Sequence, residues 1–260
     1  MQTSFCRNTW VLSVAIGFVF LNVLAFAADE HSAQAPHWSY SGDTGPAHWG
    51  DLSPEYAACS QGKEQSPVNI ASAQHANLPI IEFDYKSSAL DVINNGHTIE
   101  SEYDPGSSIT IDGKTYTLVQ FHFHHVSENA LNGKHSPLEG HLVHKSADGK
   151  LAVVAVFFDV GRANPAIATV WANMPKTAVN ENKPSGGKVN ASLLLPDNRE
   201  YYTFPGSLTT PPCTEDVTWL VMSHKMTVSK EQIAAFAAID PDDARPVQPL
   251  NGRKIELGGK

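Results

Sequence analysis

The residues best suited to chemistry lie in the segment Gln120-Phe121-His122-Phe123-His124-His125. Side chains alternate between the two faces of a β-strand, so His122 and His124 point the same way, about 7 Å apart along the strand. Phe121 and Phe123 then point the other way, into a core. Neutral imidazole nitrogen is a preferred zinc ligand, and a catalytic zinc site combines three protein ligands with one open position. The segment therefore predicts two ligands of a metal site.

A second segment, Glu139-Gly140-His141-Leu142-Val143-His144, offers a third imidazole. Glu139 and His141 share a strand face, so Glu139 can supply the carboxylate that orients a metal-bound imidazole. His144 has the opposite parity to His141, and His125 has the opposite parity to the first two histidines, so neither is expected to coordinate the metal. The spacing alone leaves a cupin-like metal site and an inert structural zinc site open.

These residues need strands to position them, and the sequence predicts many short ones. Runs of β-favouring residues are separated by turn residues such as Asn, Asp, Gly and Pro. The expected strands are Ile80–Tyr85, Asp91–Asn94, Thr98–Tyr103, Ser108–Ile111, Lys114–His124, His141–Lys145 and Leu151–Val160. The continuous apolar run Leu151–Phe158 indicates a strand that is buried on both faces.

Helical signals are few. Ser229 followed by Gln232 forms a capping-box pattern before the run Ile233–Ile239, and Pro241 ends that helix. A second short helix is expected around Pro165–Met174.

No break in composition marks a second domain. The predicted fold class is mainly β: a single domain built on a large, mostly antiparallel twisted β-sheet with a few short peripheral helices.

Composition places the chain among globular proteins. It has 260 residues, of which 42% are hydrophobic and 17% charged, and this excludes disorder, a collagen-like fibre and a small disulfide scaffold. The formal net charge is -9. This acidic balance argues against a nucleic-acid partner, because phosphate binding needs concentrated Lys and Arg.

The N-terminus has the pattern of an export signal. Arg7 precedes an apolar run, Trp10–Phe26, which ends in the small-residue exit Ala25-Phe26-Ala27. We expect a signal peptide at 1–27 and a mature domain at 28–260, exported to the periplasm or the extracellular space with no stable membrane span after cleavage. An uncleaved membrane anchor is the alternative.

Cleavage also affects the cysteine count. It removes Cys6 and leaves Cys59 and Cys213. Two cysteines in an exported protein are expected to pair, and two separate buried thiols are the alternative.

Several segments, in order, resemble the alpha-class carbonic anhydrases, and their layout is similar to that of the exported bacterial type. They are Trp38-Ser39-Tyr40, Gly45–Trp49, Gln65–Ile70, Asn94–His97, Gln120–His124, Ser127–Asn129, Glu139–His144, Ser207–Pro212, Val217–Trp219 and Arg245–Leu250. The resemblance runs from about Trp38 to Ile255, nearly the whole mature chain.

The resemblance implies a carbonate dehydratase that holds one Zn²⁺ per chain through His122, His124 and His141. Its reaction would be the reversible hydration of carbon dioxide to bicarbonate and a proton through zinc-bound hydroxide, with a histidine proton shuttle. Sulfonamides and small anions would be inhibitors.

The resemblance also implies a role for each of the other matched residues. Gln120 and Glu139 would hold two of the ligands, and Thr209 and the buried carboxylate Glu128 would orient the hydroxide. The substrate-binding residues would be Val143, Val153, Leu208, Thr210 and Trp219. His97 would be the shuttle, Tyr40 and Asn95 would order water, and Cys59 would form the disulfide with Cys213.

Two other functions fit part of this pattern. A non-catalytic binding module of the same fold is expected to lack at least one zinc histidine, and this chain has all three. A zinc hydrolase that acts mainly on esters stays open, because the sequence does not fix the size of the cleft.

Overall fold

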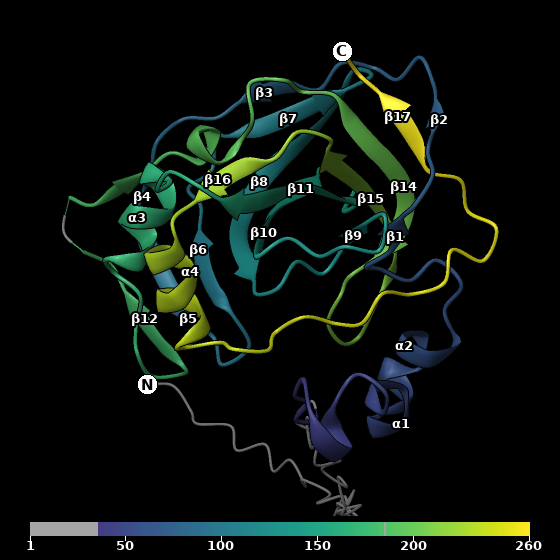
Figure 1. The fold of residues 1–260 in the computed structure, drawn as a ribbon, viewed down its shortest axis with the longest axis horizontal. Helices are drawn as coiled ribbons and strands as arrows, with labels where there is room; N and C mark the ends of the chain where they lie inside the picture. Colours follow the sequence, from purple (N-terminus) through teal and green to yellow (C-terminus); the bar gives the residue numbers. More distant parts are fainter. Residues whose placement is uncertain (1–35, 185) are drawn as a thin grey trace, which may run out of the picture. The chain divides into compact units, whose positions relative to one another are not determined.

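The computed structural model describes residues 36–184 and 186–260, which are built around one large twisted sheet (Figure 1). Within these residues the sheet has 13 strands, and its main path runs β12-β5-β6-β8-β10-β11-β15-β14-β17-β2. Strands β7 and β16 pair onto β8 and β11, and β3 pairs onto β7. Most pairings are antiparallel, whereas β11 runs parallel to both β15 and β16. The predicted fold class is confirmed.

The sheet is made mostly of short strands around a few long ones. Their bounds are β2 Gln74–His75, β3 Glu82–Asp84, β5 Asp91–Asn94, β6 Ile99–Glu102, β7 Ser108–Ile111, β8 Lys114–His124, β10 Leu138–Ser146, β11 Leu151–Val160, β12 Asn180–Asn182, β14 Tyr201–Ser207, β15 Glu215–Met222, β16 Met226–Val228 and β17 Glu256–Gly258. Two small sheets pair β1 Asn69–Ile70 with β9 Ala130–Leu131, and β4 Ser88–Ala89 with β13 Lys188–Val189.

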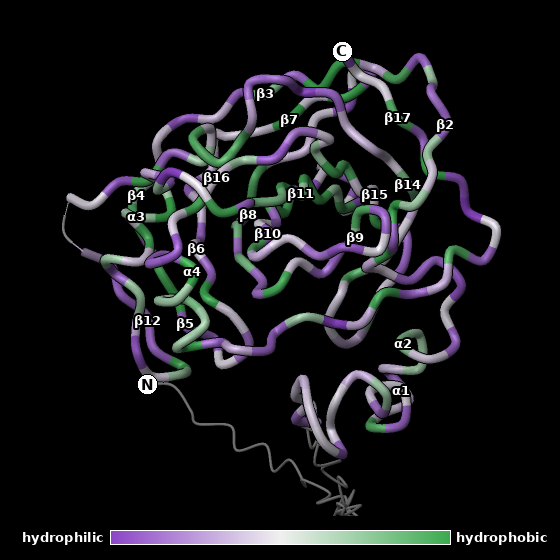
Figure 2. Tube along the Cα trace, in the orientation of Figure 1, coloured by the Kyte–Doolittle hydropathy of each residue, from purple (hydrophilic) through white to green (hydrophobic). Residues whose placement is uncertain are grey.

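The long central strands separate two apolar layers, and the most hydrophobic segments of the trace lie among them in Figure 2. Phe121 and Phe123 are buried in the larger layer, as their parity predicts. The smaller layer lies on the other side and includes Val153, Phe157 and Trp219. Strand β11 contributes to both layers, so its side chains are buried on both faces from Ala152 to Phe158. This two-sided burial explains its unbroken apolar sequence.

Two helices, α3 (Pro165–Trp171) and α4 (Lys230–Ala237), cover the side of the sheet that carries the larger layer (Figure 1). Helix α4 starts with the predicted capping box, in which Ser229 and Gln232 satisfy each other's backbone N–H groups. The Gln232 side chain also bonds to both backbone groups of Asn164, which caps α3. One glutamine therefore fixes the starts of both helices.

The N-terminal part of the described chain carries helices α1 (Trp49–Leu52) and α2 (Ala58–Gln61). Short 3-10 turns occupy Gly42–Thr44, Pro54–Tyr56 and Ala191–Leu194. Cys59 in α2 forms a disulfide with Cys213, which lies in the loop between β14 and β15, so the expected pairing is confirmed. The bond therefore joins the N-terminal helices to that loop.

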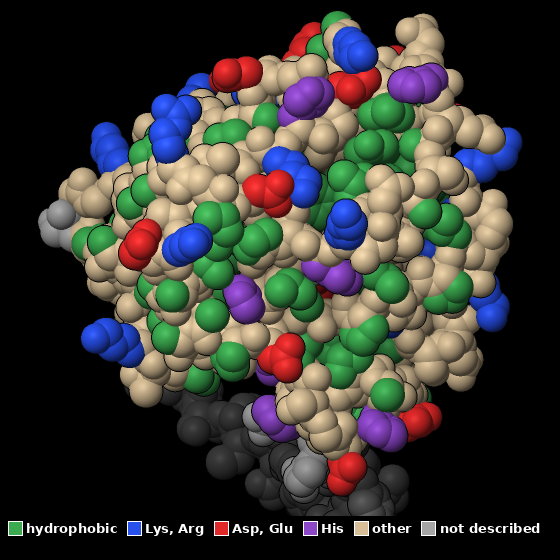
Figure 3. All heavy atoms as spheres, viewed as in Figure 1, with side chains coloured by type: hydrophobic (Ala, Val, Ile, Leu, Met, Phe, Trp, Pro, Cys, Tyr) green, Lys and Arg blue, Asp and Glu red, His purple; other side chains and the backbone are tan. Residues whose placement is uncertain are grey.

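The surface is mixed in charge. Basic and acidic side chains are interspersed over the face shown in Figure 3. Among residues 36–184 and 186–260, no helix has the length and apolar content needed to cross a bilayer. The predicted signal peptide, residues 1–27, lies outside the described residues.

Candidate active site

The candidate site is built from rows of residues that lie opposite one another on neighbouring strands. Register partners on paired strands point to the same face of a sheet, so each row forms one line of side chains on that face. The first row is Glu100, His122, His141 and Ala155; the second is Glu102, Gln120, Val143, Val153 and Trp219; the third is His124, Glu139 and Phe157. Strand pairing alone therefore brings the three predicted ligands together.

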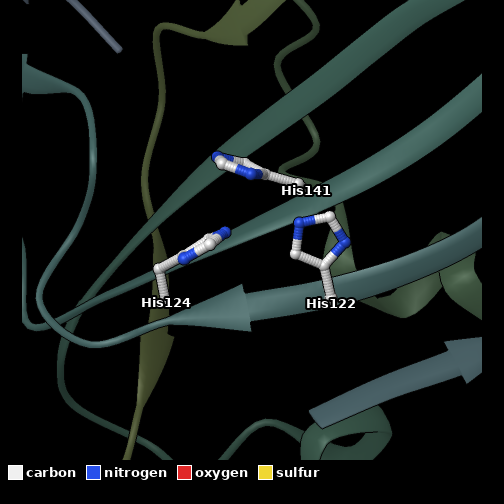
Figure 4. Close-up of side chains that lie close together, drawn as sticks. All are labelled: His122, His124 and His141. Atoms are coloured by element: carbon white, nitrogen blue, oxygen red, sulfur yellow. The ribbon is translucent and has the colours of Figure 1, made fainter. Parts of the chain in front are cut away.

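The three imidazoles converge (Figure 4). One nitrogen from each of His122, His124 and His141 lies within 4.8 Å of the other two. His124 and His141 are almost completely buried, and His122 is partly exposed toward a cavity. This is the spacing at which three side chains can hold one metal ion.

An oxygen atom faces the other nitrogen of each imidazole. The pairs are His122 Nδ1 with Gln120 Oε1 at 2.8 Å, His124 Nδ1 with the backbone oxygen of Asp243 at 2.7 Å, and His141 Nε2 with Glu139 Oε1 at 3.1 Å. An oxygen acceptor draws the ring proton to the nitrogen that it faces. The remaining nitrogens, which carry the lone pairs, are His122 Nε2, His124 Nε2 and His141 Nδ1, and these are the ones that converge (Figure 4).

The donor set fits a divalent transition metal. Burial lowers the pKa of all three imidazoles, which keeps them neutral and able to coordinate. His124 Nε2 is buried and has no hydrogen-bond partner within the described part of the chain. An orphaned buried nitrogen among converging lone pairs is costly unless a cation binds there.

A buried carboxyl group lies next to this cluster. Glu128 Oε2 is 3.4 Å from His124 Nε2, and Glu128 Oε1 accepts the backbone N–H of Arg245 at 2.8 Å. Burial raises the pKa of Glu128 to about 8, against the opposing effects of hydrogen bonds from Arg245 and from the side chain of Thr209. Thr209 therefore lies beside Glu128 at the edge of the metal-ligand cluster.

A cavity of about 130 Å³ opens onto His122 and His124. Its lining includes the predicted shuttle His97 together with Tyr40, Asn95 and Thr210. The His97 ring stacks on Trp38 with ring centres 3.7 Å apart, and burial followed by the nearby His37 lowers its pKa. Asn95 uses its side-chain oxygen to accept the backbone N–H groups of His97 and Thr98. That oxygen therefore holds the turn.

An apolar wall adjoins the cluster at His141. Val153 and Trp219 are buried there, with Val143 and Leu208 packed against them. The Trp219 ring centre is 5.0 Å from that of His141, and its indole N–H donates to the backbone oxygen of Ser207. The predicted substrate wall therefore directly adjoins the predicted ligands.

The two histidines excluded by parity lie elsewhere. His144 points to the opposite face, where Tyr85 Oη lies 2.7 Å from its Nε2. His125 contacts the segment that carries Pro241 and Asp243.

The backbone oxygen of Asp243, which holds His124, is not among the residues predicted from the sequence. The same is true of Glu100, whose Oε2 accepts a hydrogen bond from Gln120 Nε2 at 2.7 Å. The sequence carries no signal for this role, because it depends on the pairing of β6 with β8.

Comparison with known proteins agrees with this geometry. The profile of the eukaryotic-type carbonic anhydrase family matches residues 44–258. The chain therefore belongs to this family, and both the resemblance and the enzyme class predicted from the sequence are confirmed.

Individual relatives are similar over nearly their whole length. A carbonic anhydrase of Pectobacterium carotovorum is 45% identical over 90% of this chain and 96% of its own. The structure of the alpha-carbonic anhydrase from Thermovibrio ammonificans with the inhibitor sulfanilamide is 46% identical, with a TM-score of 0.83, and covers 86% of this chain and 100% of its own. Dioscorin complexed with ascorbate is also similar, at 33% identity and a TM-score of 0.79 over 85% of this chain and 97% of its own. Since the fold is shared so widely, the activity must be argued from the site.

Proposed function

We propose that this protein catalyses the reversible hydration of carbon dioxide to bicarbonate and a proton, with one Zn²⁺ held by His122, His124 and His141. The observation that carries the proposal is the convergence of three neutral imidazole nitrogens within 4.8 Å of one another, beside an apolar wall. Three neutral ligands leave the full charge of the metal in place. A zinc ion held there would lower the pKa of bound water to about 7, a value established for carbonic anhydrase itself, and would so supply a nucleophile at neutral pH.

Thr209 and Glu128 orient that nucleophile. Glu128 is buried and already accepts the N–H of Arg245, so its second oxygen is available to accept the Thr209 hydroxyl proton. A cation held by the adjacent His124 would favour the ionised form of Glu128, and a hydroxyl that donates to a carboxylate can only accept from another neighbour. Thr209 thus accepts a proton contact from the nucleophile and directs one of its lone pairs toward the substrate.

The wall formed by Val143, Val153, Leu208 and Trp219 receives the substrate. Carbon dioxide is apolar and uncharged, so it gains more from an apolar surface than from polar anchors. Thr210, which lines the cavity, and the backbone N–H of Thr209 contact the product anion. This anion is held weakly enough to leave.

His97 carries the released proton toward solvent. It shares the cavity with His122, and Tyr40 and Asn95 order water between them. Asn95 does so through its amide nitrogen, because its oxygen already binds the turn. An imidazole titrates near neutral pH and can therefore accept and release the proton in each cycle.

The mature enzyme, 28–260, is proposed to act outside the cytoplasm after removal of the signal peptide at 1–27. The disulfide between Cys59 and Cys213 supports this location, because such bonds persist in oxidising compartments. Sulfonamides and small anions are proposed as inhibitors, supported by the relative bound to sulfanilamide.

The test combines metal removal with a ligand variant. Stopped-flow hydration of carbon dioxide is measured before and after zinc is stripped with a chelator, and again after zinc is restored. Activity should disappear and return, and His122→Ala should abolish both tight zinc binding and hydration. His144→Ala is the matched control, since it removes a buried histidine from the opposite face of the same sheet. Full activity in the stripped protein or in His122→Ala would refute the proposal.

A further inference from the structure

The three imidazoles differ in what holds them. Nδ1 of His124 faces a backbone carbonyl, which can only accept a proton. Nε2 of His141 lies 3.1 Å from Oε1 of Glu139, whose two oxygens already act as acceptors for the N–H groups of Asn129. The partner of His122 is the amide of Gln120, which could present either its oxygen or its NH₂ group. Only for His122, therefore, does the partner leave the position of the ring proton undecided.

Glu100 removes that ambiguity. It lies on β6 directly opposite His122 on β8, it is partly buried, and it lines the same cavity. Its Oε2 accepts from Gln120 Nε2 at 2.7 Å, which turns the Gln120 oxygen toward His122 Nδ1 at 2.8 Å. The ring proton must then sit on Nδ1, and Nε2 keeps its lone pair toward the other two histidines.

We propose that Glu100 is a positioning residue that acts through Gln120 to fix the tautomer and the orientation of His122 as a metal ligand. The proposal deepens the proposed function, on which it rests for the role of His122. If the amide were reversed, its NH₂ would face Nδ1, and the ring proton would move to Nε2. A protonated Nε2 cannot coordinate a metal.

Glu102 provides a matched control. It lies two residues further along β6 on the same face, carries the same charge, and is the register partner of Gln120. The hydrogen bond from Gln120 nevertheless goes to Glu100. Glu102 also contacts Glu100, whose pKa it helps to raise through its charge and a side-chain hydrogen bond. Glu102→Gln therefore removes one carboxylate from the same pair while it leaves the bond from Gln120 to Glu100 in place.

The test compares Glu100→Gln with Glu102→Gln. Glutamine is isosteric with glutamate, but it can donate as well as accept, so it no longer dictates the orientation of Gln120. Two measurements are made near pH 8.5, where Glu100 is ionised because burial raises its pKa only to about 7. One is the tautomer of His122 by ¹⁵N NMR of the metal-free protein, and the other is the zinc dissociation constant by competition with a chelator.

The wild type and Glu102→Gln should show His122 protonated on Nδ1, and Glu100→Gln should show a mixture. Glu100→Gln should also weaken zinc binding about tenfold, the lower end of the effect of partners that hold metal ligands. An unchanged tautomer and affinity in Glu100→Gln, or equal losses in Glu102→Gln, would overturn the proposal. A wild-type chain that binds no zinc would instead refute the proposed function, while the tautomer of the metal-free protein would still judge Glu100.

Discussion

The disulfide allows one effect to be worked out in detail, using the double variant Cys59→Ala/Cys213→Ala. The bond joins residues separated by 154 positions in the sequence. For a loop of that length, the chain-entropy model gives about 5 kcal/mol of stabilisation at 25 °C, and measured losses for native disulfides fall at about 2–5 kcal/mol. We therefore expect the free energy of unfolding to fall by about 3–5 kcal/mol.

Activity should fall much less than stability. Cys213 is fully buried, its N–H donates to the Thr210 oxygen at 2.8 Å, and its carbonyl accepts from Gln65 at 3.0 Å. These contacts do not depend on the sulfur bridge, so the loop that carries Thr209 should keep its position in the folded variant. The bond acts mainly by restricting the unfolded chain.

Urea unfolding at 25 °C measures the stability, and stopped-flow hydration in the absence of urea measures the activity. Wild type unfolded in the presence of a reductant is the control and should match the double variant. A stability loss below about 1 kcal/mol would refute the entropic reasoning. A loss of most of the activity at unchanged stability would show instead that the bond itself holds the loop in place.

Two further outcomes follow from histidines outside the ligand set. His97→Ala should slow hydration by about 100-fold in weak buffer, the lower end of the effect of a positioned acid–base group, and added imidazole should restore the rate. A rate independent of buffer would assign the shuttle elsewhere. His144 affects stability in acid. In the folded protein burial lowers its pKa to about 3, whereas in the unfolded chain its pKa is near 6.5. The unfolded chain therefore binds the proton of this group at a higher pH than the folded protein does. Above about pH 6.5 His144 costs the folded protein nothing. As the pH drops from there toward 3, the free energy of unfolding falls by up to about 1.4 kcal/mol per pH unit. Urea unfolding from pH 4 to 7 should therefore show a shallower dependence for His144→Gln than for wild type, and equal slopes would contradict the assignment.

Much of the sheet could be read from local sequence. The expected strands Asp91–Asn94, Ser108–Ile111, Lys114–His124 and Leu151–Val160 coincide with β5, β7, β8 and β11. In each, alternation or continuous apolarity is bounded by turn residues, and both signals come from neighbours in the chain. The predicted strand at His141–Lys145 is part of a longer one, Leu138–Ser146, because pairing with β8 and β11 extends it beyond its own local signal.

Other features have no local signal. Strand β11 runs parallel to β15, and the chain between them contains α3 and other elements, so their register depends on packing across the whole domain. Helices α1 and α2 are four residues long, too short for a helical period to be visible. These elements form because tertiary contacts and the disulfide hold them.

The residues of the site also fall into two groups, those that local sequence predicts and those that depend on distant contacts. His122 and His124 could be found because two side chains two residues apart on a strand must share a face. The group that holds His124 is a backbone oxygen 119 residues away, and any residue type at that position would supply it. Glu100 is a side chain, but its role depends on the pairing of β6 with β8, which the sequence alone does not fix.

The metal ligands and the proposed proton carrier lie on different kinds of structure. The ligands lie on β8 and β10, which are paired on both sides, so their backbones are held by hydrogen bonds along both edges. His97, the proposed proton carrier, lies instead on the turn between β5 and β6. Metal coordination requires fixed distances, whereas proton transfer to solvent requires a group that can move. Substitution of the ligand histidines on β8 and β10 should therefore abolish the site, and substitution of His97 should change the rate without removing the metal.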